Sequence, residues 1–293
     1  MKVAIGIPAY NEEKNIASVI SKLSKFGYSI IVCDDGSDDQ TNQIAEKMGA
    51  LVITHKKNLG YGAAIGSLFF KAKDMGLDVL VTMDADGQHR PKDVKAVLDP
   101  ILKEEADIVI GSRFLVENKE MPSYRKTGIK MITKLANTAL DKQITDSQSG
   151  FRGYNKKVLS AISPSESGMG VSNEILIKAS KQGFKIDEVP IKVSYEGDTS
   201  THHPVSHGVS VIFSTMKFIS IEHPLKFYGI PGIVFLGIGL FFVVWALQYF
   251  TETRQILTNL VIIGVSGVIL GVVLVMNAIL LYSIVNLIRE KRN

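Results

Sequence analysis

The sequence predicts an open α/β domain with a mostly parallel sheet, followed by an amphipathic helix and two transmembrane helices. Two observations indicate this fold. Short apolar runs alternate with helix-like segments through the first half of the chain, a pattern typical of parallel α/β sheets. From residue 227 onward, by contrast, the chain holds four of the 33 basic and two of the 29 acidic residues. Residues 1–226 therefore keep 29 basic and 27 acidic residues, a balance typical of a soluble domain.

This distribution excludes several classes of protein. A wholly soluble protein would not contain a nearly uncharged, apolar last quarter. A channel with many spans would contain apolar segments along much more of the chain. The net charge of +4 is not gathered into a basic stripe, so no nucleic-acid partner is expected. The lone cysteine, Cys33, excludes a disulfide within the chain and a metal site built from several cysteines.

Five apolar runs rich in β-branched residues are expected to be strands, and the segments between them fit helices. Ligands of open α/β sheets bind beyond the carboxyl ends of the strands, where this chain places its polar clusters. The expected strands are Val3–Pro8, Ile30–Asp34, Leu51–Thr54, Val79–Met83 and Ile108–Gly111. The expected helices are Asn15–Lys25, Thr41–Met48, Gly62–Met75 and Asp93–Leu102. The polar clusters are Ala9–Glu13, Asp34–Asp39, Asn58–Gly62 and Asp84–His89.

Two uncharged runs, Phe227–Phe250 and Leu260–Tyr282, are each long enough at about 1.5 Å per residue to cross a hydrocarbon core of roughly 30 Å. Buried core helices are the alternative, but both runs exceed the usual length of such helices. The turn between them, Thr251–Asn259, carries one basic residue, whereas the C-terminal tail carries three. Basic residues favour the cytoplasmic side. We therefore expect a two-span protein of the cell membrane with both termini and the large domain in the cytoplasm.

Residues 205–223, before the first span, place apolar side chains at helical spacing with polar residues between them. This pattern predicts an amphipathic helix that lies in the membrane interface; packing against the soluble domain is the alternative. The apolar positions are Val209, Ile212, Phe213, Met216 and Ile219. The expected domains are a cytosolic domain, 1–200; a loop and interface helix, 201–226; a two-helix anchor, 227–285; and a basic tail, 286–293.

The sharpest chemical signal follows the fourth expected strand, in the sequence Asp84-Ala85-Asp86-Gly87-Gln88. Alternate residues leaving a strand point the same way, so Asp84 and Asp86 converge. Two carboxylates held close together repel unless a cation lies between them. Mg²⁺ or Mn²⁺ suits such oxygen ligands and can hold a diphosphate, with Gln88 supplying a third oxygen. A capped turn before the next helix is the alternative.

Two other clusters are less specific. Asp35 is placed at a strand end, where a carboxylate can accept hydrogen bonds from a nucleobase or a ribose, whereas Asp38 and Asp39 suit the start of the next helix. The glycines of Asn58–Gly62 resemble a phosphate-binding turn but lack the full dinucleotide spacing. Close approach to a diphosphate and a plain helix start both remain open for this turn.

Nine motifs occur together in the order and spacing of one family. They are PAYNEE (Pro8–Glu13), DDGSDD (Asp34–Asp39), NLGYGAAI (Asn58–Ile65), DADGQH (Asp84–His89), GSRF (Gly111–Phe114), YRK (Tyr124–Lys126), DSQSGFRGYNK (Asp146–Lys156), NEILIKA (Asn173–Ala179) and VPIKV (Val189–Val193). The chain thereby resembles family 2 glycosyltransferases of the GT-A fold, whose sheet is Rossmann-like. The likeness is greatest to the polyprenyl-phosphate sugar synthases of the dolichyl-phosphate mannose synthase type. It covers residues 1–193 and extends loosely into the membrane segments.

The resemblance implies a role for each matching residue. It assigns the nucleoside of a UDP- or GDP-sugar to Pro8, Tyr10, Glu12 and Asp35. It assigns Mg²⁺ or Mn²⁺ with its diphosphate to Asp84, Asp86 and Gln88. Arg113 and Arg125 would face the phosphate of a polyprenyl acceptor, either dolichyl or undecaprenyl phosphate, because guanidinium groups match the geometry of phosphate oxygens. Together with Asp86, both arginines would act in catalysis. Arg125 on a solvated face beside Lys126 is the alternative, and Arg152 is either structural or a diphosphate ligand. A homo-oligomer is compatible with the sequence.

The expected activity is an inverting, metal-dependent transfer of a hexose or N-acetylhexosamine to a polyprenyl phosphate, for protein or cell-surface glycosylation. A phosphate monoester is already an anionic nucleophile at pH 7, whereas a hydroxyl acceptor needs a base. The acidic Glu-Asp pair that supplies this base in many relatives is missing, and Glu174 is either a substitute base or structural. The alternatives are a transferase acting on a lipid hydroxyl or a polysaccharide, and a non-catalytic scaffold that binds nucleotide sugars.

The chain departs from the mannose synthase pattern after Val193, where a basic stretch is replaced by a loop with three histidines. This departure leaves the donor sugar open, with glucose or N-acetylglucosamine as candidates beside mannose. A loop that closes over the acceptor is expected here, and a zinc site is the weaker alternative. The histidines are His202, His203 and His207.

Overall fold

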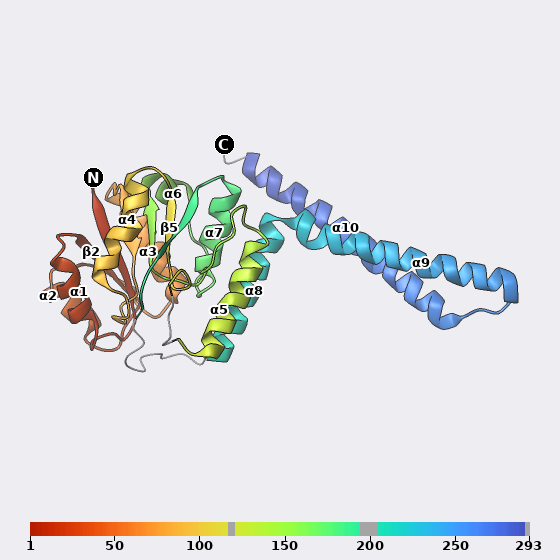
Figure 1. Cartoon of the computed structure of the whole chain (residues 1–293), viewed down its shortest axis with the longest axis horizontal. Coiled ribbons are helices and arrows are strands. Elements are labelled where there is room, and N and C mark those ends of the chain that lie inside the picture. The colour runs from red at the N-terminus through yellow and green to blue at the C-terminus, as the bar shows by residue number, and fades with distance from the viewer. Residues whose placement is uncertain (117–120, 194–203, 291–293) are drawn as a thin grey trace. The chain divides into compact units, whose positions relative to one another are not determined.

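The computed structural model describes residues 1–116, 121–193 and 204–290. It divides into two compact units, Met1–Met216 and Lys217–Asn293. The first unit is built on a seven-stranded sheet of order β3-β2-β1-β4-β6-β5-β7 (Figure 1). The strands are β1 (Val3–Ala9), β2 (Ser29–Asp34), β3 (Leu51–Thr54), β4 (Val79–Thr82), β5 (Ile108–Ser112), β6 (Arg152–Asn155) and β7 (Ile186–Pro190).

The sheet is mostly parallel, as predicted. β1 pairs in parallel with β2 and β4, β2 with β3, and β5 with β7, whereas β6 runs antiparallel to both β4 and β5. The carboxyl ends of β1, β2 and β4 therefore lie at one edge, and the register pairs Ala9 with Asp34. The polar clusters after these strands are brought to the same place, which confirms the expected arrangement.

The helices of the first unit connect the strands. They are α1 (Ile16–Ser24), α2 (Thr41–Lys47), α3 (Tyr61–Asp74), η1 (Pro91–Asp93), α4 (Val94–Leu102), α5 (Ser123–Asn137), α6 (Lys156–Ala161), α7 (Val171–Lys181) and α8 (Pro204–Glu222), of which α8 crosses the unit boundary. All five expected strands and all four expected helices are confirmed to within about two residues.

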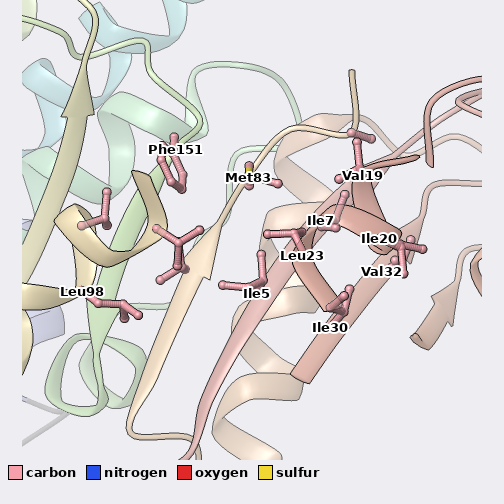
Figure 2. Close-up of a cluster of buried hydrophobic side chains, with 14 of the residues drawn as sticks. Ile5, Ile7, Val19, Ile20, Leu23, Ile30, Val32, Met83, Leu98 and Phe151 are labelled. Carbon is pink, nitrogen blue, oxygen red and sulfur yellow. The ribbon is translucent and has the colours of Figure 1, made fainter. Parts of the chain in front are cut away.

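A hydrophobic core lies between the sheet and helices α1 and α4 (Figure 2). Ile5 and Ile7 on alternate positions of β1 point to the same face and meet apolar side chains of α1. In α1 these recur at the i, i+3, i+4, i+7 spacing of one helix face, and the four residues are Ile16, Val19, Ile20 and Leu23. Burial of this stripe fixes the loop between β1 and α1, which carries Tyr10 and Glu12.

Two strands, β6 and β7, are not among those predicted from the sequence. β6 has the sequence Arg-Gly-Tyr-Asn, which lacks an apolar run, although Arg152 and Tyr154 are buried in the structure. β7 lies at the sheet edge, contains two acids and ends at Pro190, where a missing N–H is tolerated. Both strands are held by tertiary contacts rather than by a local pattern.

Helix α8 presents a register different from the predicted one. Val211 and Thr215 are buried, whereas Val209, Phe213 and Met216, three of the five predicted apolar positions, are exposed. The amide of Asn173 on α7 donates a 2.6 Å hydrogen bond to the Thr215 hydroxyl, so α8 packs on the first unit through a face that holds Val211 and Thr215. An exposed apolar face is left over, as an interface helix requires, so placement at the membrane stays a prediction.

The second unit contains two long apolar helices. The first, Leu225–Thr253, consists of a π-helical turn, η2 (Leu225–Gly229), followed by α9 (Ile230–Thr253). The second, Thr258–Ile288, lies within α10 (Thr258–Glu290). Both are long and apolar enough to cross a membrane. They approach closely through small residues: a Cβ on Gly239 would lie 2.4 Å from the Val268 nitrogen. The expected pair of long apolar helices is confirmed, and their crossing of a membrane stays a prediction.

His202 and His203 lie outside the described residues, and residues 204–208 begin α8. The acceptor loop and the zinc alternative therefore stay predictions.

Candidate active site

Asp84 leaves the end of β4 and is held by three neighbours. The Tyr61 hydroxyl donates a hydrogen bond to Asp84 Oδ1 over 3.1 Å, and His89 Nε2 lies 3.5 Å from Oδ2. Gly150 lies against the same carboxylate, so closely that a Cβ there would lie 2.5 Å from Oδ1. About a third of the Asp84 side chain remains exposed. A fixed, ionised and still accessible carboxylate is what a ligand for a cation requires.

Asp86 completes the predicted carboxylate pair. Burial and the charge of Asp84 raise the pKa of Asp86, although the hydrogen bond from the Gln88 N–H and the Arg125 charge oppose this. Burial would also raise the pKa of Asp84, but hydrogen bonds from His89 and Tyr61 outweigh it, and this pKa is lowered. Negative charge is thus concentrated on Asp84, with Asp86 repelled by it.

Glu12, from the loop after β1, faces the same pair. Its backbone N–H donates to the Thr41 hydroxyl and its Oε2 accepts from the Asn15 amide, which fixes the side chain. Burial raises the pKa of Glu12, and the charges of Asp86 and Asp84 raise it further. Three carboxylates from two strand ends therefore share one electrostatic environment and repel one another.

The residues present fit a divalent metal. Within the residues that the structure describes, no three His, Cys, Asp or Glu side chains gather closely enough to hold an ion. The predicted set consists instead of two carboxylates and the amide of Gln88, all oxygen donors of the kind preferred by Mg²⁺ and Mn²⁺. Burial and then the charge of Asp84 raise the pKa of Asp86, and a bound cation would oppose both effects.

Arg113 reaches the site from the end of β5. Its Nε and Nη2 donate to the two carboxylate oxygens of Asp146 over 2.6 and 2.8 Å, and both side chains are buried. Burial alone would raise the pKa of Asp146, but the Arg113 charge and hydrogen bonds lower it overall. The Arg113 charge also contributes to the lowered pKa of Asp84, after the effects of His89 and Tyr61. Asp146 thus holds Arg113 in one orientation through a bidentate contact.

Arg125 lies on the first turn of α5 and is half-buried. Its charge lowers the pKa of Asp86. This interaction favours the predicted site role over the alternative of a solvated face. Two arginines from different elements therefore act on the two predicted metal ligands.

The carboxylate of Asp35 is more occupied than the sequence suggested. It is buried and accepts hydrogen bonds from the backbone N–H groups of Leu59 and Gly60 over 3.0 and 2.8 Å, and its Oδ1 lies 2.6 Å from His55 Nδ1. The observed task of Asp35 is to hold the turn before α3, and contact with a nucleoside stays a prediction. Asp39 accepts from the Thr41 N–H at the start of α2, as predicted, whereas the Asp38 side chain makes no such bond within the described residues.

The glycines of the Asn58–Gly62 turn approach the protein's own backbone. Gly62 N–H donates to the Ser167 carbonyl over 2.8 Å, and a Cβ on Gly60 would lie 2.4 Å from that oxygen. The loop around Ser167 therefore occupies the space that a diphosphate would need. The plain helix start, one of the two interpretations left open, describes this turn.

Pro8 and Tyr10 lie at the end of β1 and directly after it, and their contact with a nucleoside stays a prediction. Pro8 is buried as the last residue but one of β1, and Tyr10, just after the strand, is half-exposed. Asn11, with φ of 56°, turns the chain, and its side-chain oxygen accepts from the Asp38 N–H. This contact joins the loops after β1 and β2 into one rim beside Glu12.

The structure decides the roles of two residues, Arg152 and Glu174, for which the sequence left two alternatives open. Arg152 is buried and donates to the carbonyls of Ser147, Ser149 and Ser172, so its role is structural. Glu174 is fully buried on α7, and its carboxylate accepts from Lys178 and from backbone and side-chain donors of residues 165–166. A carboxylate so occupied is structural rather than a substitute base.

Tyr61, Gly150 and Asp146 contact the site residues although the sequence did not predict them there. All three stand within the quoted motifs, but their roles depend on contacts 23, 66 and 33 residues away in sequence. A separate cavity of about 620 Å³ lies between β3 and α3, and none of the predicted site residues lines it.

The chain is similar in sequence to proteins of one glycosyltransferase family. Residues 4–163 match the family described as glycosyl transferase family 2. The UDP-N-acetylglucosamine–dolichyl-phosphate N-acetylglucosaminyltransferase of Methanococcus voltae is 35% identical, over 72% of this chain and 91% of that protein. The dolichyl-phosphate hexose transferase of Haloferax volcanii is 31% identical, over 76% of this chain and 96% of that protein.

Among solved structures, the glucosyl-3-phosphoglycerate synthase of Mycobacterium tuberculosis, in complex with Mn²⁺, UDP and glucosyl-3-phosphoglycerate, superposes with a TM-score of 0.61. The identity is 22%, over 74% of this chain and 79% of that one. This likeness confirms the expected fold.

Proposed function

The chain belongs to glycosyl transferase family 2, and from this premise we propose that it transfers a sugar from a nucleotide sugar to a polyprenyl phosphate at a membrane surface. The observation that carries the proposal is the convergence of charges at the end of β4. Two carboxylates, Asp84 and Asp86, interact with two arginines, Arg113 and Arg125, that come from other elements. Such a site suits two phosphate-bearing substrates, one through a metal and one through guanidinium groups.

The donor end of the site comprises Asp84, Asp86 and Gln88, which would hold Mg²⁺ or Mn²⁺. A divalent cation there supplies Lewis-acid stabilisation of the departing nucleoside diphosphate. Hydrogen bonds from Tyr61 and the nearby His89 keep Asp84 ionised for this task.

The rim formed by the loops after β1 and β2 would receive the nucleoside. Pro8, Tyr10, Glu12 and Asp35 belong to it. The base is a uracil or a guanine; the name of the M. voltae relative supports UDP.

The acceptor end comprises Arg113 and Arg125. Arg113 is held in one orientation by Asp146, and its charge contributes to the lowered pKa of Asp84. A phosphate monoester, with a second pKa near ~6, needs no base to attack an anomeric carbon. This agrees with the structural role of Glu174. Both named relatives are described by a dolichyl-phosphate acceptor. In-line attack opposite the leaving diphosphate would invert the anomeric centre.

Membrane attachment follows from the acceptor. A polyprenyl tail stays in the bilayer, so its phosphate must be met at the surface. The helices Leu225–Thr253 and Thr258–Ile288 would anchor the protein, and the exposed Phe213 side of α8 would lie in the interface. The excess of basic residues outside the turn between the helices supports cytoplasmic termini and a cytoplasmic catalytic unit.

Transfer assays with the full chain in detergent test this proposal. Radiolabelled UDP- and GDP-sugars are incubated with a polyprenyl phosphate, with Mn²⁺ or Mg²⁺ and then with EDTA. We expect product with at least one donor, full loss with EDTA, and full loss in Asp86→Ala. Transfer that survives EDTA would contradict the metal role. Donor binding by calorimetry without turnover on any polyprenyl phosphate would favour a scaffold instead.

A further inference from the structure

Tyr61 is the first residue of α3, and the backbone on both sides of it is fixed. The preceding N–H, of Gly60, donates to Asp35 Oδ2 over 2.8 Å, and the following N–H, of Gly62, donates to the Ser167 carbonyl over 2.8 Å. Gly60 has a φ of 100°, which favours glycine, and leaves no room for a Cβ beside Ser167. The Tyr61 side chain therefore starts from a rigid point.

The other end of Tyr61 meets Asp84. Its hydroxyl donates to Oδ1 over 3.1 Å, while Gly150 packs against the same carboxylate and His89 approaches Oδ2 at 3.5 Å. Tyr61 thus connects two strand ends. Asp35, after β2, accepts hydrogen bonds from the turn that precedes Tyr61, and Asp84, after β4, accepts a hydrogen bond from the Tyr61 hydroxyl. One short element connects the nucleoside rim with the predicted metal ligand.

We propose that Tyr61 is a positioning residue that orients Asp84 for a divalent cation. The inference rests on the metal role of Asp84 in the proposed function. A hydrogen bond to one carboxylate oxygen favours the ionised form and restricts rotation of the group. Partners of this kind fix the direction and basicity of a metal ligand, and their loss costs roughly 10- to 100-fold in metal affinity.

Mn²⁺ binding to the full chain in detergent, without donor sugar, measures this effect directly. Tyr61→Phe removes the hydroxyl and keeps the ring, so we expect the dissociation constant for Mn²⁺ to rise about tenfold or more. Tyr154→Phe is the matched control. Tyr154 is buried and lines the same small internal cavity as Tyr61, but its ring packs edge-on against Phe69 and its hydroxyl interacts with Arg152 and Thr82, while Asp84 acts on it through charge alone. Its variant should bind Mn²⁺ as the unaltered protein does.

Two further measurements separate the possible results. The melting temperature of the metal-free protein reports any structural loss, and a tenfold weaker Mn²⁺ affinity with a melting temperature no lower than that of Tyr154→Phe supports positioning. Unchanged Mn²⁺ affinity in Tyr61→Phe, with binding lost in Asp84→Asn, would overturn the role of Tyr61 and leave the proposed function intact. Unchanged affinity in Asp84→Asn would overturn the metal site itself and the inference with it.

Discussion

Gly150→Ala should inactivate the protein through a single added methyl group. An alanine Cβ at this position would lie 2.5 Å from Asp84 Oδ1 and 2.6 Å from Oδ2, whereas ordinary contact begins at 3.4 Å. The carboxylate must therefore move by about 0.9 Å. The backbone cannot retreat easily, because the Gly150 carbonyl accepts from the Thr82 hydroxyl over 2.8 Å and the next residue, Phe151, is fully buried.

A displacement of about 1 Å in an active site can lower the rate roughly 100-fold. We expect at least this loss in transfer from nucleotide sugar to polyprenyl phosphate, with weaker Mn²⁺ binding and a stability loss of about 1–3 kcal/mol from overpacking. Gly66→Ala on α3 is the control, because its Cβ would have 3.9 Å of clearance and alanine favours a helix. Full turnover and unchanged Mn²⁺ affinity in Gly150→Ala would refute the position assigned to the Asp84 carboxylate.

Three further substitutions test other parts of the site. Asp146→Asn leaves the buried Arg113 charge without its ionic partner, so we expect roughly 3–5 kcal/mol of destabilisation at pH 7, measured by thermal unfolding. Because the folded-state pKa of Asp146 is lowered, its stabilisation is present above about pH 4 and lost as the pH falls toward the folded pKa; the variant should lose this acid dependence, and an identical pH profile would count against the ion pair. Glu174→Gln should lower the melting temperature through a loss of about 2 kcal/mol while pre-folded protein keeps its turnover per molecule, and a specific loss of kcat would reinstate it as a base. Arg125→Ala should raise the KM for polyprenyl phosphate about tenfold and leave donor binding unchanged, as measured by steady-state kinetics and calorimetry; an unchanged acceptor KM would exclude the predicted contact.

Much of the sheet could be predicted from the sequence because its central strands are continuous apolar runs. β1, with Ile5 and Ile7 buried, is recognisable without any tertiary information. β6 is not, because its burial depends on Arg152 reaching three carbonyl groups that come together in the folded chain. A charged residue at the start of a strand gives no local signal for such a contact.

The site shows the same division. Asp84 and Asp86 could be predicted from their alternation at a strand end, and the structure brings them together with Arg113 and Arg125. The glycines of the turn before α3 matched a phosphate loop in composition, yet the structure uses them to pack against Ser167. A glycine in the sequence indicates that another group approaches the backbone closely, but it does not indicate whether that group is a ligand or part of the protein.

The acceptor is the central claim, and a side-by-side assay tests it most directly. The full chain in detergent, with Mn²⁺ and a radiolabelled donor, is given a polyprenyl phosphate or the polyprenol of the same chain length. Arg113 and Arg125 near the carboxylate pair, and a Glu174 that is too occupied to act as a base, predict a labelled lipid with the phosphate and none with the alcohol. Equal or greater transfer to the polyprenol would contradict the account.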